Sequence, residues 1–287
     1  MAAGQGPVTA FTHARPEETD DALRHLCAIA SGEGLVVRLD EEETRKHPAI
    51  AGSAGVEVDA AIDPDSSVAI ALGGDGTVLR ALREFAGTAV PVYGVNFGEI
   101  GFLAASGREE VPGSFREALS GNFERLAMPA IGVAGAGGSL FAFNDVALTR
   151  RAGDRVAELA YSVAGEEVGR VRSDGIVVAT PAGSTGYNLA NGGPVMAWGV
   201  EGFVVSFIAP HSLTARALVV APDDELRIQN RSADPVELSI DGRPVAEVAP
   251  GDEIAAGFAP DKAVLALPEQ SSFYRRLRDT FGRLSSS

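Results

Sequence analysis

The chain has 287 residues, 45% hydrophobic and 22% charged, a composition typical of soluble globular proteins and a length that suits two domains. Its formal net charge of −15 argues against the extended basic surface that nucleic acids or anionic membranes require. The single cysteine, Cys27, excludes an internal disulfide, no apolar run approaches the roughly 18 residues of a membrane span, and residues 1–7 lack a secretory signal. We therefore expect a cytoplasmic protein with neither nucleic-acid nor membrane partners.

Residues 1–121 alternate between strand and helix patterns. Apolar strands are expected at residues 8–11, 35–39, 68–72 and 90–95, and apolar residues recur at helical spacing over 23–30 and 78–85. The run VAIAL at 68–72 is apolar throughout, as in strands that are buried on both faces of a parallel sheet. The pattern predicts an α/β domain with an open, mostly parallel sheet that binds ligands at the carboxyl ends of its strands.

Residues 122–270 consist mainly of short strands separated by turns, which predicts a β-rich, mostly antiparallel domain. The expected strands lie at residues 130–134, 141–148, 156–163, 175–179, 202–208, 218–221, 225–228, 236–240 and 263–267. One helix is expected over 184–191. Residues 271–287 contain an amphipathic helix beginning at Phe273, which we expect to return to the first domain.

The chain contains only two lysines, Lys46 and Lys262, and neither follows a glycine-rich loop. It therefore lacks both the G-x-x-x-x-G-K-[ST] motif of P-loop proteins and the strand lysine of protein kinases. If the chain transfers phosphoryl groups, backbone N–H groups and arginines must hold the phosphates.

Residues 73–77 read GGDGT directly after the apolar strand. Glycines on both sides of Asp75 let the backbone approach a ligand closely, and their N–H groups suit a polyphosphate beside the positive end of a helix dipole. Asp75 is then free to face the hydroxyl that is phosphorylated. The structural alternative is a tight turn in which Asp75 caps the helix. The preceding apolar strand and the doubled glycine favour the functional interpretation.

The GGDGT run resembles the signature shared by NAD kinases, by diacylglycerol and sphingosine kinases and, more loosely, by 6-phosphofructokinases. Further motifs resemble NAD kinases in order and spacing: residues 96–103 (NFGEIGFL, with Glu99 where a basic residue is common), 143–145 (FND, with Asp145 in place of glutamate), 173–187 (with Gly186 in place of alanine), 210–216 and 241–243. The resemblance covers nearly the whole chain. It implies transfer of the γ-phosphoryl group of ATP to the adenosine ribose 2′-hydroxyl of NAD, which makes NADP.

By this resemblance, Asp75 accepts the proton of the 2′-hydroxyl. A free aspartate has a pKa of about 3.9 and is a weak base, so the carboxylate is expected to orient the hydroxyl as much as deprotonate it. Gly74 and Gly76 flank it at the phosphates. Arg80 and Arg243 are assigned to phosphate groups, because a guanidinium binds phosphate in a bidentate manner.

The resemblance also implies the dinucleotide contacts. Asn144 and Asp145 would bind the adenine edge and ribose hydroxyls. Asp174 would accept from the nicotinamide carboxamide with Arg155 and Arg172 nearby, and a charge at the position of Arg172 is associated in the family with a preference for NAD over NADH. The adenosine end would be wrapped by Thr185, Gly186, Tyr187, Asn188, Leu189 and Ala190. The structural alternatives are a turn at Asn144 and a helix cap at residues 183–185.

A divalent cation, expected to be Mg²⁺, would bridge the phosphates of ATP, and the resemblance implies a homodimer or homotetramer. Two other functions stay open. A lipid or sugar kinase would use the same glycine-rich turn but would leave the motifs at 143–145 and 180–187 without a role. A non-catalytic dinucleotide sensor would be expected to lack Asp75, which is present.

Overall fold

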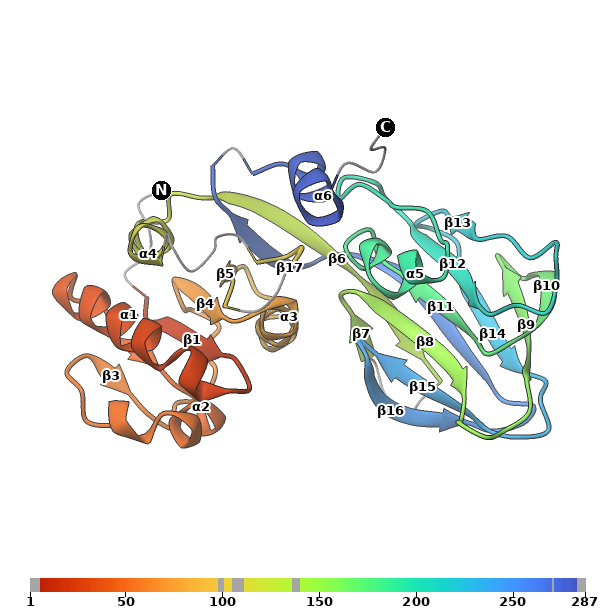
Figure 1. Cartoon of the computed structure of the whole chain (residues 1–287), viewed down its shortest axis with the longest axis horizontal. Helices are drawn as coiled ribbons and strands as arrows, with labels where there is room; N and C mark the ends of the chain where they lie inside the picture. The colour runs from red at the N-terminus through yellow and green to blue at the C-terminus, as the bar shows by residue number, and fades with distance from the viewer. Residues whose placement is uncertain (1–5, 98–100, 105–110, 136–139, 270, 283–287) are drawn as a thin grey trace. The chain divides into compact units, whose positions relative to one another are not determined.

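The structure, a computed structural model, describes residues 6–97, 101–104, 111–135, 140–269 and 271–282 (Figure 1). The chain divides into two compact units: Met1–Met128 with Asp261–Ser287, and Pro129–Pro260. The sequence placed the boundaries at residues 121 and 270. The division falls elsewhere because strands β6 (Glu124–Ala134) and β17 (Glu253–Leu267) each run across it.

A parallel sheet forms the centre of the first unit. Its neighbouring strands are β5 (Pro91–Val95), β4 (Val68–Leu72), β1 (Val8–Thr12), β2 (Val37–Arg38) and β3 (Val56–Glu57), and the end of β17 pairs in parallel with β5. Strands β1, β4 and β5 are buried at every position, as their apolar sequences require. Thr12 pairs with Leu72, and Leu72 with Val95, so these three strands end at the same edge.

Helices cover both faces of this sheet. Helices α1 (Asp20–Gly32) and α4 (Val111–Ser120) contact each other and share a buried cluster with Ala10 and Ile70. Helix α3 (Asp75–Glu84) contacts β1, β4 and β5, and Phe11 packs edge-on against Phe85 at its end, with the ring centroids 6.2 Å apart. Because adjacent residues of a strand point to opposite faces, Ala10 and Phe11 place α3 on the face opposite α1. Helix α2 (Glu41–Lys46) and the 3₁₀ turns Pro16–Glu18 and Pro48–Ile50 complete this part.

The second unit is built from antiparallel strands. One sheet has the order β13 (Leu218–Val220), β12 (Phe203–Ile208), β11 (Gly175–Ala179), β8 (Asp145–Arg150), β15 (Val236–Ile240) and β16 (Arg243–Val248). The other strands are β10 (Glu166–Ser173), β9 (Ala157–Val163), β14 (Leu226–Asn230) and the first part of β17, with β6 pairing to β7 (Leu140–Ala142).

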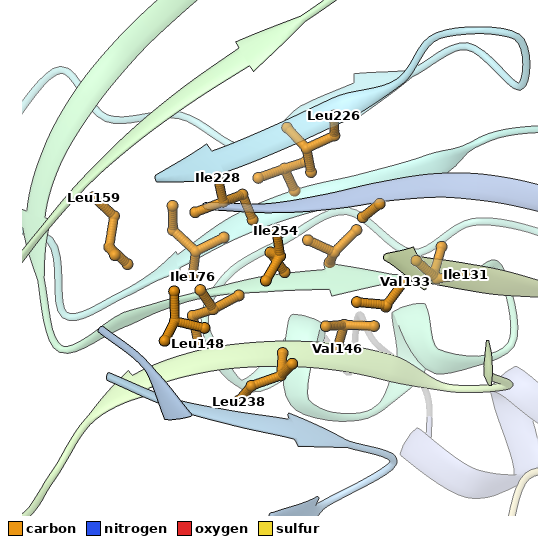
Figure 2. Packing of buried hydrophobic residues seen from close by; sticks show 14 of the residues in the cluster. Ile131, Val133, Val146, Leu148, Leu159, Ile176, Leu226, Ile228, Leu238 and Ile254 are labelled. Atoms are coloured by element: carbon orange, nitrogen blue, oxygen red, sulfur yellow. The ribbon is translucent and has the colours of Figure 1, made fainter. Parts of the chain in front are cut away.

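The core of the second unit lies between these two sets of strands. Figure 2 shows Leu148, Ile176 and Leu238 of the first sheet directed toward side chains such as Ile228 and Ile254. All five are fully buried or nearly so. The alternation of apolar and polar residues along β14 and β15 places their apolar side chains in this layer.

The predicted fold class is confirmed: an α/β unit with a parallel sheet is followed by a mostly antiparallel β unit. Among the details that differ, three lie in the second unit. Residues 141–148 form two strands, because Phe143 and Asn144 separate β7 from β8. Strands β10 and β16 were not expected. The helix expected over 184–191 is interrupted at Gly186, which divides a 3₁₀ turn (Gly183–Thr185) from the one-turn helix α5 (Tyr187–Ala190).

Helix α6 (Phe273–Phe281) belongs to the first unit, as predicted. It begins after Ser272, whose hydroxyl accepts a hydrogen bond from the N–H of Arg275 at 3.2 Å. Phe273 is its buried residue. Within the described part of the chain, no helix combines the length and the apolar character needed to cross a membrane.

Candidate functional site

The GGDGT turn joins the carboxyl end of β4 to the start of α3. The N–H of Gly73 donates to the carbonyl of Val95 at 2.9 Å, and a Cβ at Gly73 would lie 2.2 Å from Oγ1 of Thr77. A side chain is therefore excluded at this position. Gly74 is the N-cap of α3, and Gly76 is exposed with open space where a side chain would be. The first N–H groups of a helix have no acceptor within it, and those of Gly74 and Gly76 donate to no residue that the structure describes.

Asp75 is the first residue of α3, and its carboxylate is held by the loop that follows β5. Oδ2 accepts from the N–H of Phe102 at 2.8 Å, and Oδ1 accepts from Leu103 at 2.9 Å and from Ala104 at 3.3 Å. A Cβ at Gly101 would lie 2.6 Å from Oδ1, so glycine is required for this approach. The motif at residues 96–103 is thus in contact with the GGDGT turn.

Three N–H donors occupy three of the about four lone-pair positions of a carboxylate. Counting only donors from the described residues, the open position belongs to Oδ2 of Asp75, which accepts one hydrogen bond whereas Oδ1 accepts two. Asp75 is half-buried, so its open position is compatible with a ligand hydroxyl. Glu99, which departs from the family pattern, lies outside the described residues.

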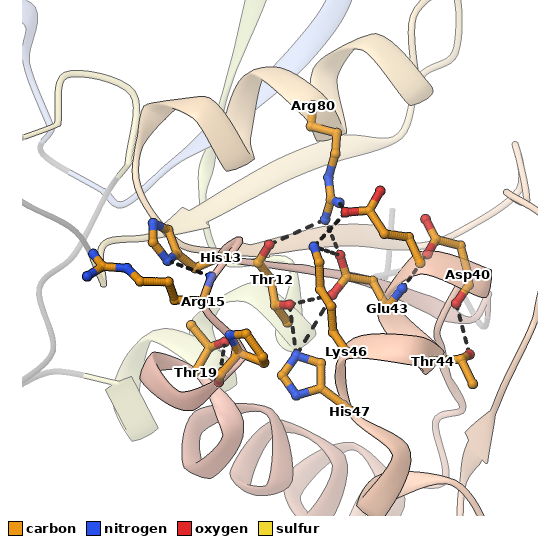
Figure 3. A network of polar contacts seen from close by, with 12 residues as sticks. Thr12, His13, Arg15, Thr19, Asp40, Glu43, Thr44, Lys46, His47 and Arg80 are labelled. Atoms are coloured by element: carbon orange, nitrogen blue, oxygen red, sulfur yellow. Dashed lines mark hydrogen bonds and ion pairs between the residues drawn. The ribbon is translucent and has the colours of Figure 1, made fainter.

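Arg80, which the sequence assigned to phosphate, is instead paired with carboxylates (Figure 3). Its guanidinium contacts Glu42 at 2.5 Å and also Glu43, and it lies over the ring of Phe11, 5.2 Å from the centroid. Burial alone would lower the pKa of Arg80, but the charge of Glu43 and its hydrogen bond raise it. Because two acids already compensate the charge of Arg80, the structure gives no support to its assignment to phosphate.

The same buried cluster joins α2 to β1. Glu43 is fully buried and accepts hydrogen bonds from the hydroxyl of Thr12 and from Lys46, the latter at 3.2 Å. His47 lies 2.8 Å from the same hydroxyl and contacts Asp20 through Nδ1. Although Asp20, His47 and Thr12 form a chain of hydrogen bonds, Thr12 is only 2% exposed. The cluster therefore stabilises the unit and does not present a nucleophile.

In the second unit, Asn144 and Asp145 are gathered around the turn between β15 and β16. The carboxylate of Asp241 accepts from the N–H of Asn144 at 2.7 Å and from those of Phe143 and Asp145 at 3.3 Å. Asp241 has φ of 47° and Gly242 has φ of 73°, a pair typical of a tight hairpin turn. Asp241 is a residue whose organising role was not identified from the sequence.

Asp145 is 8% exposed, and its pKa is raised to about 7, first by burial and then by the charge of Asp241. Asn144 is half-buried, and its carbonyl accepts from the N–H of Thr180 at 2.9 Å. A Cβ at Gly183 would lie 1.9 Å from the carbonyl oxygen of Asn144. The Phe-Asn-Asp and Thr-Pro-Ala-Gly motifs are therefore packed directly on each other.

The segment from Thr185 to Ala190 contains both exposed and structural residues. Tyr187 is 41% exposed, and its pKa is raised by burial and by the charges of Asp145 and Asp174. Gly186 and Ala190 are exposed, whereas Leu189 and Thr185 are half-buried. The hydroxyl of Thr185 donates to the carbonyl of Ala182 at 3.0 Å.

Asn188, expected to contact the ligand, is fully buried instead. Its Nδ2 donates to the carbonyls of Ser184 at 2.9 Å and Pro194 at 3.0 Å. A Cβ at Gly193 would lie 1.8 Å from Oδ1 of Asn188. Because the amide is enclosed where it ties α5 to the Gly-Gly-Pro turn, the structure gives no support to a side-chain contact with substrate.

Asp174 is paired with Arg150, which the sequence did not single out. Nε of Arg150 donates to Oδ1 of Asp174 at 2.6 Å. This hydrogen bond lowers the pKa of Asp174, and the charge of His211 acts in the same direction. Asp174 is 35% exposed and can still accept further hydrogen bonds.

Arg155, Arg172 and Arg243 are all exposed. Their guanidinium groups form no ion pair with the residues that the structure describes, so they are available to an anionic ligand. Among the described residues there is also no group of three or more His, Cys, Asp or Glu side chains arranged to hold a metal ion.

Comparison with known proteins gives a consistent result. Residues 33–123 match the ATP-NAD kinase N-terminal domain, and residues 143–266 match the ATP-NAD kinase C-terminal domain. The NAD kinase of Carboxydothermus hydrogenoformans is 35% identical over 239 residues, which cover 80% of this chain and 85% of that protein. The NAD kinase of Symbiobacterium thermophilum is 36% identical over 263 residues, or 88% of this chain and 93% of that protein.

Two solved structures share the fold. Yeast NADH kinase complexed with NADH has a TM-score of 0.84 and 23% identity, covering 98% of this chain and 89% of its own. An NAD kinase from Archaeoglobus fulgidus in complex with ATP has a TM-score of 0.69 and 24% identity, covering 96% of both chains. With both domain models matched and relatives at about 35% identity over most of their length, the chain belongs to the NAD kinase family.

Proposed function

We propose that this protein is an NAD kinase, which transfers the γ-phosphoryl group of ATP to the 2′-hydroxyl of the adenosine ribose of NAD and so makes NADP. The observation that carries the proposal is the carboxylate of Asp75, held by three N–H groups at the carboxyl end of β4 in a chain of this family. A carboxylate fixed in this way can receive a hydroxyl in a defined orientation.

Oδ2 of Asp75 is the atom that we assign to the substrate, because it has the open lone-pair position. The 2′-hydroxyl donates its hydrogen bond to Oδ2, and its oxygen then forms a bond to the γ-phosphorus. The bond from the γ-phosphorus to the bridging oxygen of ADP breaks, and the hydroxyl proton passes to Oδ2. Because phosphoryl transfer depends mainly on positioning and charge neutralisation, orienting the hydroxyl is the larger part of this role.

The donor phosphates would bind at the glycine-rich turn. The N–H groups of Gly74 and Gly76 lie where α3 begins, and the helix dipole favours negative charge there. Arg80 is not part of this assignment, since Glu42 and Glu43 hold it. Arg243, which is exposed at the start of β16, is kept as a phosphate ligand.

The dinucleotide would bind along the motifs of the second unit. Asn144 supplies an amide to the adenine edge, and Asp145 accepts from ribose hydroxyls. Tyr187 offers an aromatic surface, with Thr185, Gly186, Leu189 and Ala190 around the adenosine. Asp174 accepts from the nicotinamide carboxamide, and Arg155 and Arg172 lie close to the dinucleotide. The exposure of Tyr187 and the charge of Asp174 support this assignment.

The divalent cation, expected to be Mg²⁺, would enter with ATP as part of the substrate. Mg²⁺ commonly keeps several waters and is bound by phosphate oxygens with one or two carboxylates. The phosphate oxygens of ATP would hold the cation, and no cluster of three or more ligating side chains occurs among the described residues.

A homodimer or homotetramer is part of the proposal. Val168, Val219 and Val245 are 50%, 51% and 44% exposed, and they lie on β10, β13 and β16, strands at the ends of their sheets. Exposed apolar residues on sheet edges favour association with another copy. A cytoplasmic location stays a prediction.

One assay tests the function. Purified protein is incubated with ATP, Mg²⁺ and NAD, and the product is detected with an NADP-specific dehydrogenase. NADP formation supports the proposal. Tight NAD binding without NADP would indicate a sensor. Neither binding nor turnover would favour a lipid or sugar kinase that uses the same glycine-rich turn.

A further inference from the structure

The C-terminal helix contacts the loop that holds Asp75. The ring of Phe102 packs against Phe273 with centroids 5.4 Å apart, and against Phe281 with centroids 6.4 Å apart. Phe102 is 5% exposed and Phe273 is 8% exposed. Helix α6 therefore packs on the loop through its aromatic residues.

Arg276 of the same helix adds a charged contact with this loop. Its Nη1 donates to the carbonyl of Ala104 at 2.6 Å and to that of Phe102 at 3.1 Å, and its Nε donates to the hydroxyl of Ser271 at 2.9 Å. Burial lowers the pKa of Arg276, and the charge of Asp75 opposes that effect. The two charged groups thus act on each other electrostatically, although they are separated by the loop.

One peptide group connects them directly. The carbonyl of Phe102 accepts from Arg276, and the N–H of Leu103, which belongs to the same peptide unit, donates to Asp75. The positive charge lies at the oxygen end of this peptide dipole, and the negative charge lies at the hydrogen end. Hydrogen bonds in such a chain polarise and strengthen one another. The orientation of this peptide group is therefore determined from both sides.

We propose that Arg276 is a positioning residue for phosphoryl transfer: it holds the carbonyls of Phe102 and Ala104 and thereby fixes the N–H groups that orient the carboxylate of Asp75. The inference rests on the proposed function for its kinetic consequence. Arg276 itself touches neither phosphate nor dinucleotide in this scheme. It determines whether Oδ2 of Asp75 meets the hydroxyl in the correct geometry, and small misplacements at a reacting centre reduce rates strongly.

The alternative is that Arg276 only anchors α6 to its unit. An anchor would affect stability, and any loss of activity would follow the loss of folded protein. A positioning residue lowers kcat in protein that is fully folded and leaves the KM for NAD nearly unchanged, since all the proposed NAD contacts except that of the 2′-hydroxyl with Asp75 are made by other residues. The two roles therefore differ in a measurable way.

The experiment compares Arg276→Met, Arg276→Lys and the matched control Arg278→Met. Arg278 lies on the same helix, is exposed and pairs with Asp279. We expect Arg276→Met to lower kcat by about 10- to 100-fold with the KM for NAD within about twofold. Arg276→Lys should keep an intermediate rate, because an ammonium group can still donate to the two carbonyls. Arg278→Met should behave as the wild type.

Two further measurements make the outcome decisive. Hydrogen exchange at the amides of Leu103 and Ala104 should become faster in Arg276→Met and not in Arg278→Met, whether or not NAD is the substrate. Guanidinium ions, far below denaturing concentrations, should restore part of the activity of Arg276→Ala.

If the wild-type protein makes no NADP, the proposed function is wrong, but the positioning role of Arg276 is not tested by that result and still depends on the exchange measurement. Unchanged exchange together with unchanged kcat in Arg276→Met would overturn the positioning role, and so would a loss of kcat that only parallels unfolding.

Discussion

Two acidic side chains of the proposed site, Asp75 in the first unit and Asp145 in the second, have opposite surroundings. In the first, Asp75 accepts hydrogen bonds from three backbone N–H groups, and the fully buried Glu43 is paired with Arg80. In the second, Asp145 is buried beside Asp241, and its carboxyl oxygens accept no hydrogen bond from the residues that the structure describes. Hydrogen bonds or ion pairs thus compensate Asp75 and Glu43, whereas no described residue compensates Asp145.

This difference indicates where a ligand is needed. Backbone N–H donors and cations stabilise a carboxylate in its charged form, while burial beside another acid favours the neutral form. Asp75 is thus fixed before any substrate arrives. Asp145 lacks donors until a ligand supplies them, and ribose hydroxyls are donors of that kind. The first unit is arranged to hold a reacting group, and the second is arranged to receive a substrate.

The largest expected effect comes from Asp75→Asn. An amide keeps one oxygen but loses the second acceptor and the site that receives the hydroxyl proton. We expect kcat to fall about 10³-fold, within the range typical of general acid–base groups, with the Kd for NAD within about twofold. Steady-state assays and calorimetry without ATP measure the two quantities. A normal rate in this variant would remove Asp75 from the mechanism.

The next-largest effect is expected when the negative charge of the buried Glu43 loses its partner Arg80. Arg80→Met removes a buried partner, and we expect the free energy of unfolding to fall by about 3 kcal/mol while the KM for ATP stays within about twofold. The exposed Arg24 on α1 provides a control variant, Arg24→Met, which should change neither. If Arg80 bound phosphate after all, the KM for ATP would rise at least tenfold without this loss of stability.

A smaller effect is expected from displacing Asp75 without altering it. In Gly101→Ala the new Cβ would lie 2.6 Å from Oδ1 of Asp75, so the carboxylate must shift. We expect kcat to fall by about 10-fold, because the reacting hydroxyl loses its alignment. Gly113 of α4 has open space around it, and Gly113→Ala should leave kcat unchanged while slightly stabilising the helix. An unchanged kcat in Gly101→Ala would show that the position of Asp75 is not critical.

The sequence predicted those parts of the fold that depend on local patterns. Strand β4 was found with its correct bounds, because five apolar residues before a glycine turn have few alternatives. Strand β10 was missed because its residues are mainly polar, and β16 was missed because Pro244 weakens the strand pattern. They are strands because β9 and β15 supply their hydrogen-bond partners, and pairing across the sheet is not visible in local composition.

The site shows the same limit. The motif around Asp75 was recognised from adjacent residues, whereas the role of Asp241 depends on a contact with Asn144 across 97 positions. The ion pair of Arg80 with Glu43 was not expected for a similar reason, since the two residues are 37 positions apart. An arginine one turn after a glycine-rich loop indicates a phosphate ligand only when no acidic side chain forms an ion pair with it.

The smallest effect concerns the uncompensated acid. The pKa of Asp145 rises from its ordinary 3.8 to about 7, so the folded chain binds an extra proton between these values. The free energy of unfolding therefore falls as the pH rises from about 4 to about 7, and the loss is complete above that range. A shift of this size corresponds to at most about 4 kcal/mol, of which we expect about 1 kcal/mol to be measured.

Urea unfolding at pH 5 and pH 8 measures this effect. Asp145→Asn should lose the difference between the two pH values that the wild type shows, and the exposed Asp223→Asn should retain it. NAD supplies a further test: if ribose hydroxyls donate to the carboxylate, wild-type affinity for NAD should increase as the pH rises through about 7, and that of Asp145→Asn should not. Equal pH dependence in both proteins would mean that Asp145 is already compensated, and the contrast between the two units would then disappear.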